Sequence, residues 1–177
     1  MLLPIILTIL PLVTPSPINR TCMTITGVTH TFYGFPDNDP PGPTIAMDCG
    51  RGYIAGGSGT YSDPVTFASA EGEFNPCEII YDPYIQKYLR YEDHCADCTV
   101  DWKRGVVHID VWTGNNTLSG GDDQINCEFA LTTGTQTIVR GPRVNLPVVA
   151  EDLYVPGTKD SCRTDLRIFG YSTRGFC

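Results

Sequence analysis

The sequence has little helical periodicity. No window of a dozen residues places apolar side chains at i, i+3, i+4 and i+7 without a glycine or proline interrupting it. Basic residues are also scarce, with 12 Lys and Arg against 20 Asp and Glu and a net charge of −8. No Lys/Arg cluster offsets this charge locally, which excludes nucleic acid as a partner because phosphates require a basic surface. The chain contains no Gly-x-Ser-x-Gly elbow and no phosphate-binding glycine loop, which leaves serine hydrolases and P-loop enzymes unsupported.

The chain begins with an apolar segment that is typical of a secretory signal peptide. We assign residues 1–19 to this peptide, with cleavage between Thr14 and Met23. The segment is short for a bilayer span, so a signal anchor is the less favoured alternative. Residues 20–177 are enough for a single domain with its own core. We therefore predict a secreted, extracellular monomer without membrane contact after signal removal and without a cofactor.

Cysteine usage agrees with an oxidising compartment. An even set of cysteines in a secreted chain indicates up to four disulfides, although the spacing leaves their pairing open. The disulfide candidates are Cys22, Cys49, Cys77, Cys95, Cys98, Cys127, Cys162 and Cys177. Two glycosylation sequons, at Asn19 and Asn115, are weak additional support for secretion.

The remaining pattern predicts a mainly β protein. Short runs rich in β-branched and aromatic residues recur between turn signals, a spacing typical of a sandwich or closed barrel. The runs are VTHTFYGF, PVTFAS, EIIYD, KYLRYED, GVVHIDVWTG, INCEFALT and QTIVRG. Residues 82–89 are compatible with one short helical turn. The tail over 142–177 is irregular, and we expect Cys162 and Cys177 to attach it to the body.

Two aspartates are the strongest catalytic candidates. Strand alternation places Asp93 in phase with Leu89 and Tyr91, and Asp110 in phase with Trp112. Burial among apolar side chains disfavours the charged carboxylate and raises its pKa toward the range of a general acid. Paired carboxylates of this kind perform glycoside hydrolysis. The alternative is that both aspartates cap turns or accept backbone hydrogen bonds.

Further residues are candidates for contacting a glycan. Aromatic side chains stack on sugar rings, and hydroxyl or imidazole groups bind their hydroxyls. The predicted substrate-binding residues are Thr60, Tyr61, Tyr91, His108 and Trp112. Asp37, Asp39 and Asp48 are additional acidic candidates in loops, where solvated turn positions are the more common role.

The Cys95-x-x-Cys98 motif has two other interpretations. With His94 and His108 nearby it resembles half a zinc site, but an oxidising compartment disfavours thiolate ligands. A redox role is disfavoured because no βαβ context surrounds the motif. We therefore predict no metal.

Four segments carry a resemblance to a known group of proteins. The order YGF, GTYSDPVTFAS, CEIIYDPYIQKYLRYEDHCADC and HIDVWTG, from Val28 to Leu131, resembles double-psi β-barrel proteins. Within this group the chain is most similar to small secreted fungal muramidases, and more distantly to bacterial three-Asp lytic transglycosylase domains and expansins. The resemblance implies a six-stranded double-psi barrel that cleaves the β-1,4 bond between N-acetylmuramic acid and N-acetylglucosamine in peptidoglycan. Asp93 is then the acid and Asp110 the second carboxylate.

The chain also departs from the bacterial pattern. The strand PVTFAS lacks the aspartate found there, so a third carboxylate is without support. A non-catalytic, expansin-like wall-binding or carbohydrate-binding protein and an endoglucanase are alternatives on the same fold. A secreted effector or inhibitor is favoured if Arg90, Lys103 or Arg104 forms ion pairs with the two aspartates. The residues do not distinguish a hydrolase from a lytic transglycosylase.

Overall fold

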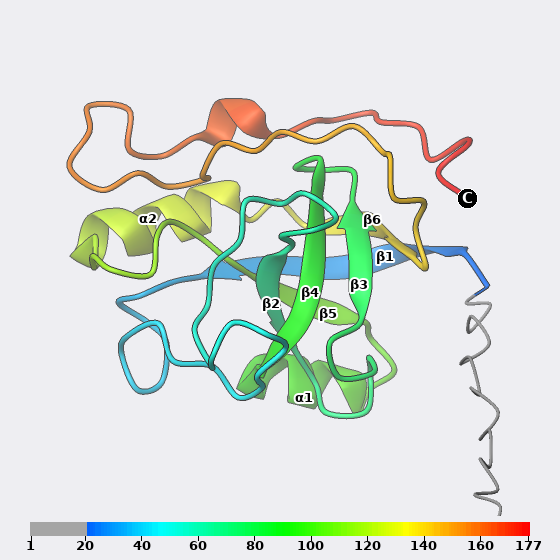
Figure 1. The fold of residues 1–177 in the computed structure, drawn as a ribbon, viewed down its shortest axis with the longest axis horizontal. Helices are drawn as coiled ribbons and strands as arrows, with labels where there is room; N and C mark the ends of the chain where they lie inside the picture. Colours follow the sequence, from blue (N-terminus) through cyan, green and yellow to red (C-terminus); the bar gives the residue numbers. More distant parts are fainter. Residues whose placement is uncertain (1–20) are drawn as a thin grey trace, which may run out of the picture.

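The computed structural model describes residues 21–177, so the predicted signal peptide lies outside the described residues. A six-stranded closed barrel forms the body (Figure 1). The strands are β1 (Met23–Tyr33), β2 (Val65–Ser69), β3 (Ile79–Asp82), β4 (Lys87–His94), β5 (His108–Trp112) and β6 (Thr135–Arg140). The helices are α1 (Ala96–Trp102), α2 (Gly121–Leu131) and the 3-10 turn η1 (Thr164–Leu166). The predicted mainly β class is confirmed.

The order of strands around the barrel is β1-β5-β2-β4-β3-β6. β1 pairs in parallel with β5, and β2 pairs in parallel with β4. The connection from β1 to β2 passes over β5, and the connection from β4 to β5 passes over β2. These two crossings overlap, and such a pair of interlocked connections is the double-psi arrangement that the resemblance implied.

Alternation along the strands sorts side chains between the barrel core and its outside. Ile109 and Val111 of β5 are fully buried in the main apolar cluster, together with Phe67 of β2 and Leu89 of β4. Asp110 lies between the two buried β5 residues and remains partly exposed. Ile109 and Val111 thus face the core as predicted, whereas His108 and Trp112, predicted on the same face as Asp110, are buried as well.

Helix α2 corrects one sequence expectation. The run INCEFALT, predicted as a strand, lies in a helix that packs against β1 (Figure 1). Its buried side chains are Gln124, Cys127, Glu128 and Leu131, which follow the helical spacing i, i+3, i+4 and i+7. Two of these four are polar, so the apolar pattern that marks an amphipathic helix is missing. The loop after β4, which carries Cys95 and Cys98, also contains a helix, α1. Residues 83–86, where the sequence is compatible with a short helical turn, form the turn between β3 and β4.

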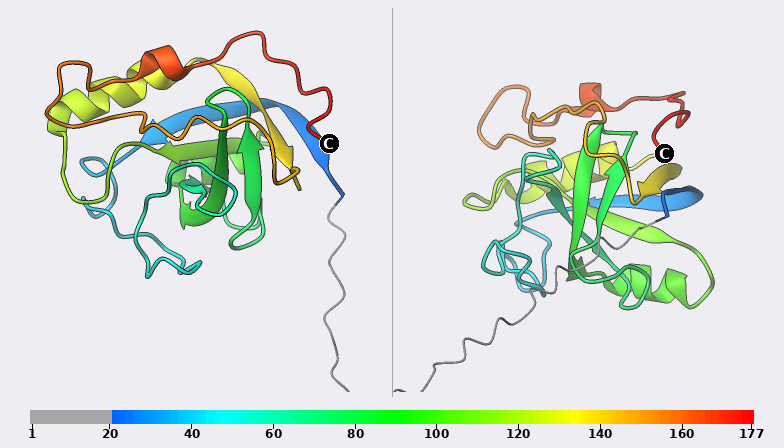
Figure 2. Two further views of the ribbon diagram at one scale, coloured as in Figure 1. Left: turned by 45° about the horizontal axis from the view of Figure 1, so that its top comes forward. Right: turned by 45° about the vertical axis from the view of Figure 1, so that its right-hand side comes forward.

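Four disulfides connect the barrel to its loops and ends, as the even number of cysteines predicted. The pairs are Cys22–Cys177, Cys49–Cys77, Cys95–Cys98 and Cys127–Cys162. Cys162 attaches the C-terminal segment to α2, and Cys177 brings the end of the chain beside the start of β1 (Figure 2). The expectation that these two cysteines hold the tail is confirmed. Within residues 21–177, no helix has the length and apolar character needed to cross a membrane.

Candidate active site

A pocket of about 360 Å³ opens between the end of β1, the start of β5 and the start of α1. Its wall combines the end of β1, the loop that follows it, and residues of β5 and α1. The lining residues are Thr31, Phe32, Tyr33, Asp37, Asn38, Asp39, Ala68, His94, Cys95, Ala96, Asp97, His108 and Asp110. Four of them are aspartates, and the lining contains no Lys or Arg. The pocket is therefore strongly acidic.

Asp110 is the central carboxyl group of this pocket. The parallel register of β1 and β5 places it opposite Thr31, whose Oγ1 donates a hydrogen bond of 2.8 Å to its Oδ1. Burial, with a smaller contribution from the charges of Asp37, Asp93 and Asp97, raises the pKa of Asp110 to about 7, although the Thr31 hydroxyl lowers it. Asp110 is therefore largely protonated in mildly acidic solution, the state that a general acid requires.

A chain of side-chain contacts extends from Asp110 toward the surface. His108 Nε2 lies 3.0 Å from Thr31 Oγ1, and His108 Nδ1 lies 2.9 Å from Asp101 Oδ2. Burial lowers the pKa of His108, an effect that the neighbouring Asp101 opposes. In the neutral imidazole of His108, Nδ1–H donates a hydrogen bond to Asp101. When Asp110 is protonated, it donates to the Thr31 hydroxyl, and this hydroxyl then donates to His108 Nε2. This series of hydrogen bonds fixes the orientation of the β5 side chains that line the pocket.

Asp93 lies behind the pocket wall. It is only 7% exposed, and its Oδ1 accepts hydrogen bonds from the backbone N–H groups of Ala46 and His94, at 3.0 and 2.9 Å. Its Oδ2 accepts a 3.1 Å hydrogen bond from the hydroxyl of Tyr33, which does line the pocket. Burial raises the pKa of Asp93, and the three hydrogen bonds oppose this. Asp93 is thus placed to orient Tyr33 and the loop around Ala46.

Neither candidate carboxylate is neutralised by a basic side chain. Among residues 21–177, neither Asp93 nor Asp110 takes part in a salt bridge. Arg90 pairs instead with Glu92 at 2.7 Å, while Lys103 and Arg104 are exposed. The ion pairs that would have favoured an effector or inhibitor are therefore not formed.

The predicted substrate-binding residues fall in different places. His108 lines the pocket. Tyr91 is buried in the core and packs with Phe67, so its ring is not available to a ligand. Trp112 is also buried, and it contacts Tyr33 edge to face with ring centroids 5.2 Å apart. Trp112 therefore supports a pocket residue from behind and offers no surface for stacking on a sugar.

Thr60 and Tyr61 lie outside the residues that line the pocket. Thr60 accepts a hydrogen bond from the backbone N–H of Asp63 within its own turn. Tyr61 is half exposed and packs edge to face on Tyr88. Both residues stabilise their loop in this structure, the role that turn chemistry commonly gives such side chains.

Sequence reasoning missed Thr31, Tyr33 and Asp97 as pocket residues. Thr31 and Tyr33 sit two positions apart on β1, so alternation places them on one face, but their neighbours on β5 follow only from the strand register. Asp37 and Asp39 had been assigned to the more common solvated role, yet both line the pocket. Their position depends on how the loop after β1 folds back.

The Cys95-x-x-Cys98 motif forms a disulfide beside the pocket. Its two sulfurs lie within 4.8 Å of a ring nitrogen of His108, the arrangement that suggested half a zinc site. Because the sulfurs are bonded to each other, they are not thiolate ligands in this state. The disulfide instead closes the turn into α1, where Cys95 Sγ accepts a hydrogen bond from the Cys98 N–H.

Fold and site together define a disulfide-linked, closed six-stranded β-barrel with an acidic pocket at the end of β1 and the start of β5. Residues 25–163 match the family described as the DDB_G0273701 N-terminal domain, and the chain belongs to this family. It is 34% identical over 133 residues to an uncharacterized protein of Dictyostelium discoideum, DDB_G0273701/DDB_G0273221. That alignment covers 75% of this chain and 57% of the relative. No solved structure matches the chain.

Proposed function

We propose that the protein is a secreted glycoside hydrolase of the muramidase type, acting on the β-1,4 bond between N-acetylmuramic acid and N-acetylglucosamine in peptidoglycan. The observation that carries this proposal is Asp110, whose pKa is raised to about 7 in a pocket lined by three further aspartates. A carboxylic acid that stays protonated near neutral pH, beside a carboxylate that stays ionised, is the requirement of acid-assisted glycoside cleavage.

The geometry favours specific roles for the carboxylates. Asp110 reaches the pocket and its raised pKa of about 7 leaves it a proton to give, so it protonates the leaving glycosidic oxygen. Asp37 lines the same pocket and is the strongest charge acting on Asp110, which makes it the second carboxylate, as base or as stabiliser of the oxocarbenium-like transition state. Asp93, the acid suggested by the sequence resemblance, is a positioning residue in this scheme because it acts through Tyr33.

Secretion is part of this proposal. Four disulfides in one small domain are typical of proteins that fold in an oxidising compartment. They agree with the apolar start of the chain. An acidic surface and a pocket lacking Lys and Arg suit a neutral glycan as ligand better than a polyanion.

The test is cleavage of purified peptidoglycan at pH 5, with chitin and cellulose as parallel substrates and mass spectrometry of the soluble products. We expect muropeptides from peptidoglycan, and a rate at least about 100-fold lower for Asp110→Asn, the loss typical of a missing general acid. Asp122→Asn, an exposed acid in the first turn of α2, is the matched control and should retain full activity.

Other outcomes would redirect the assignment. Soluble products from cellulose alone would indicate an endoglucanase. Retention of the protein on peptidoglycan without any product would contradict the hydrolase and indicate a non-catalytic wall-binding barrel of the expansin type. The products also distinguish the reaction, since a hydrolase leaves a reducing muramic end and a lytic transglycosylase leaves an anhydro end.

A further inference from the structure

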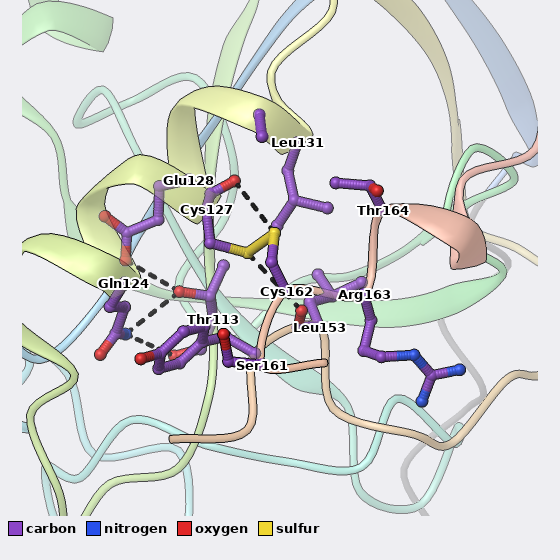
Figure 3. The surroundings of a disulfide bond; sticks show 12 residues. Thr113, Gln124, Cys127, Glu128, Leu131, Leu153, Ser161, Cys162, Arg163 and Thr164 are labelled. Carbon is purple, nitrogen blue, oxygen red and sulfur yellow. Dashed lines mark hydrogen bonds between the residues drawn. A yellow bond between two sulfur atoms is a disulfide. The ribbon is translucent and has the colours of Figure 1, made fainter. Parts of the chain in front are cut away.

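Glu128 is a buried acid that the proposed reaction does not use directly. It lies on the barrel-facing side of α2 and is 3% exposed. Its Oε1 accepts a 2.9 Å hydrogen bond from the hydroxyl of Thr113 (Figure 3). Its Oε2 is buried without a hydrogen-bond partner, one of two such side-chain atoms within residues 21–177. An ionised carboxylate in this position would leave one oxygen unsatisfied, which is costly.

The surroundings of Glu128 connect it to the pocket wall. A Cβ atom placed on Gly34 would lie 2.6 Å from Glu128 Oε1, so α2 packs directly on the backbone at the end of β1. The N–H of Gly34 donates a 2.8 Å hydrogen bond to Asp37 Oδ1, which holds the Asp37 carboxylate at the same point of the chain. Glu128 and Asp37 thus both adjoin Gly34, one through packing and the other through a hydrogen bond.

The charges around Glu128 favour a retained proton. No Lys, Arg or His in the described part of the chain forms an ion pair with it. The groups that face it from the neighbouring elements are Asp37 after β1, Asp110 on β5 and the Tyr154 hydroxyl of the C-terminal segment. Burial and the charge of Asp37 raise the pKa of Glu128 to about 8, whereas the Thr113 hydroxyl lowers it.

We propose that Glu128 is a neutral carboxylic acid whose Oε2–H donates a hydrogen bond to the carboxylate of Asp37, and that this shared proton positions Asp37 in the pocket. The donor accounts for the unpartnered oxygen, because a protonated Oε2 next to an ionised acceptor is satisfied. Glu128 is then a positioning residue for the second carboxylate, a role that rests on the proposed glycosidase function. The shared proton itself does not depend on that function.

The first experiment measures the proton directly. In protein labelled with ¹³C at the side-chain carboxyl groups, the Glu128 resonance is followed by NMR from pH 3 to 10. We expect Glu128 to remain protonated at pH 6.5, and Asp37→Asn to lower its titration midpoint by about one unit or more, since the charged acceptor is lost. Asp122→Asn, on the exposed side of α2, is the control and should not move the midpoint.

This experiment has a clear negative outcome. Titration of Glu128 in the ordinary carboxyl range of about 4 to 5, or a midpoint that Asp37→Asn leaves unchanged, would overturn the shared proton. Both variants are first checked for an unchanged backbone spectrum, so that a folding defect is recognised before the titration is interpreted.

A second experiment tests the positioning role. In Glu128→Gln the amide keeps a donor for Asp37 and an acceptor for Thr113, so kcat on peptidoglycan should remain within about threefold of the wild type. In Glu128→Ala the donor is lost, so kcat should fall at least tenfold with KM little changed, and the acid limb of the pH–rate profile should move. Equal activity of the two variants would refute positioning. Absence of cleavage by the wild type would instead refute the glycosidase, while the NMR titration still decides the shared proton.

Discussion

Asp110 shows at the scale of a single residue how burial changes the pKa of a carboxyl group. Its neighbours on β5, Ile109 and Val111, are buried in the core, whereas Asp110 turns outward into the pocket and remains partly exposed. The hydrogen bond from the Thr31 hydroxyl favours the ionised form and opposes the effects of burial and of the neighbouring acids on the pKa. The balance leaves a carboxyl group that keeps its proton at a pH where a solvated aspartate has lost it.

This balance predicts a pH dependence of stability. The folded-state pKa of Asp110 is raised from 3.8 to about 7, so the folded protein binds its proton more tightly than the unfolded chain. Stability is therefore highest below pH 4 with respect to this group and decreases as the pH rises to 7. Asp110→Asn removes the ionisation, so it should stabilise the protein relative to wild type at pH 8, by about 1 to 3 kcal/mol, and much less at pH 4.

Thermal unfolding of the wild type and Asp110→Asn at pH 4 and pH 8 measures this difference. Asp122→Asn is again a suitable control, because its side chain is exposed. A difference between wild type and Asp110→Asn that is the same at both pH values would show that Asp110 ionises as it does in water.

At the scale of elements, the contact between α2 and β1 determines the shape of one pocket wall. A Cβ on Gly34 would lie 1.9 Å from Gln124 Nε2 as well as 2.6 Å from Glu128 Oε1, so only glycine fits at the end of β1. Gln124 and Glu128 in turn hold Thr113, which follows β5, through hydrogen bonds (Figure 3). The helix thereby joins the ends of β1 and β5 above the pocket.

Gly34→Ala should therefore destabilise the protein, by roughly 1 to 3 kcal/mol as in other overpacked sites. The added methyl group must displace Gln124 or Glu128, and the loop that carries Asp37 should shift with them. Chemical denaturation measures the loss. The double variant Gly34→Ala/Gln124→Ala removes the closer clash, and it should cost less than the sum of the two single variants. Strict additivity would contradict a direct contact.

The same element shows where sequence patterns were insufficient. Four buried positions of α2 have helical spacing, but Gln124 and Glu128 are polar, so the helix was predicted as a strand. β4 gives a second case: Tyr91 and Asp93 pair with the consecutive β2 residues Phe67 and Ala68, so a register shift interrupts the regular ladder before Asp93. Simple alternation describes Asp93 poorly because such irregularities change the direction of side chains.

At the scale of the whole molecule, one disulfide joins the two ends of the described chain. Cys22 and Cys177 are 155 residues apart in sequence, whereas Cys95 and Cys98 are separated by 3. Closing a long loop removes more conformational entropy from the unfolded chain than closing a short one, in the chain-entropy account of disulfide stability. The long disulfide should therefore contribute more to stability than the short one, although only the short one adjoins the pocket.

Paired serine substitutions test this order. Cys22→Ser/Cys177→Ser should lower the free energy of unfolding by about 4 kcal/mol and leave the pocket intact. Cys95→Ser/Cys98→Ser should cost less stability, and it should reduce the proposed peptidoglycan cleavage because Cys95 lines the pocket and precedes α1. The reverse order of unfolding free energies would contradict the loop-length argument.

The sequence by itself determined the mainly β class, the number of disulfides and the burial of Ile109 and Val111 on β5. These properties depend on local spacing and on residue type, which are visible along the chain. Only the tertiary structure decided which strands are neighbours, which cysteines pair, and which acids meet in the pocket. The parallel pairing of β1 with β5 sets Thr31 against Asp110, and the packing of α2 places Glu128 against Gly34 at the end of β1. Such contacts join residues up to about a hundred positions apart, and they form only when the closed barrel brings distant strands and helices together.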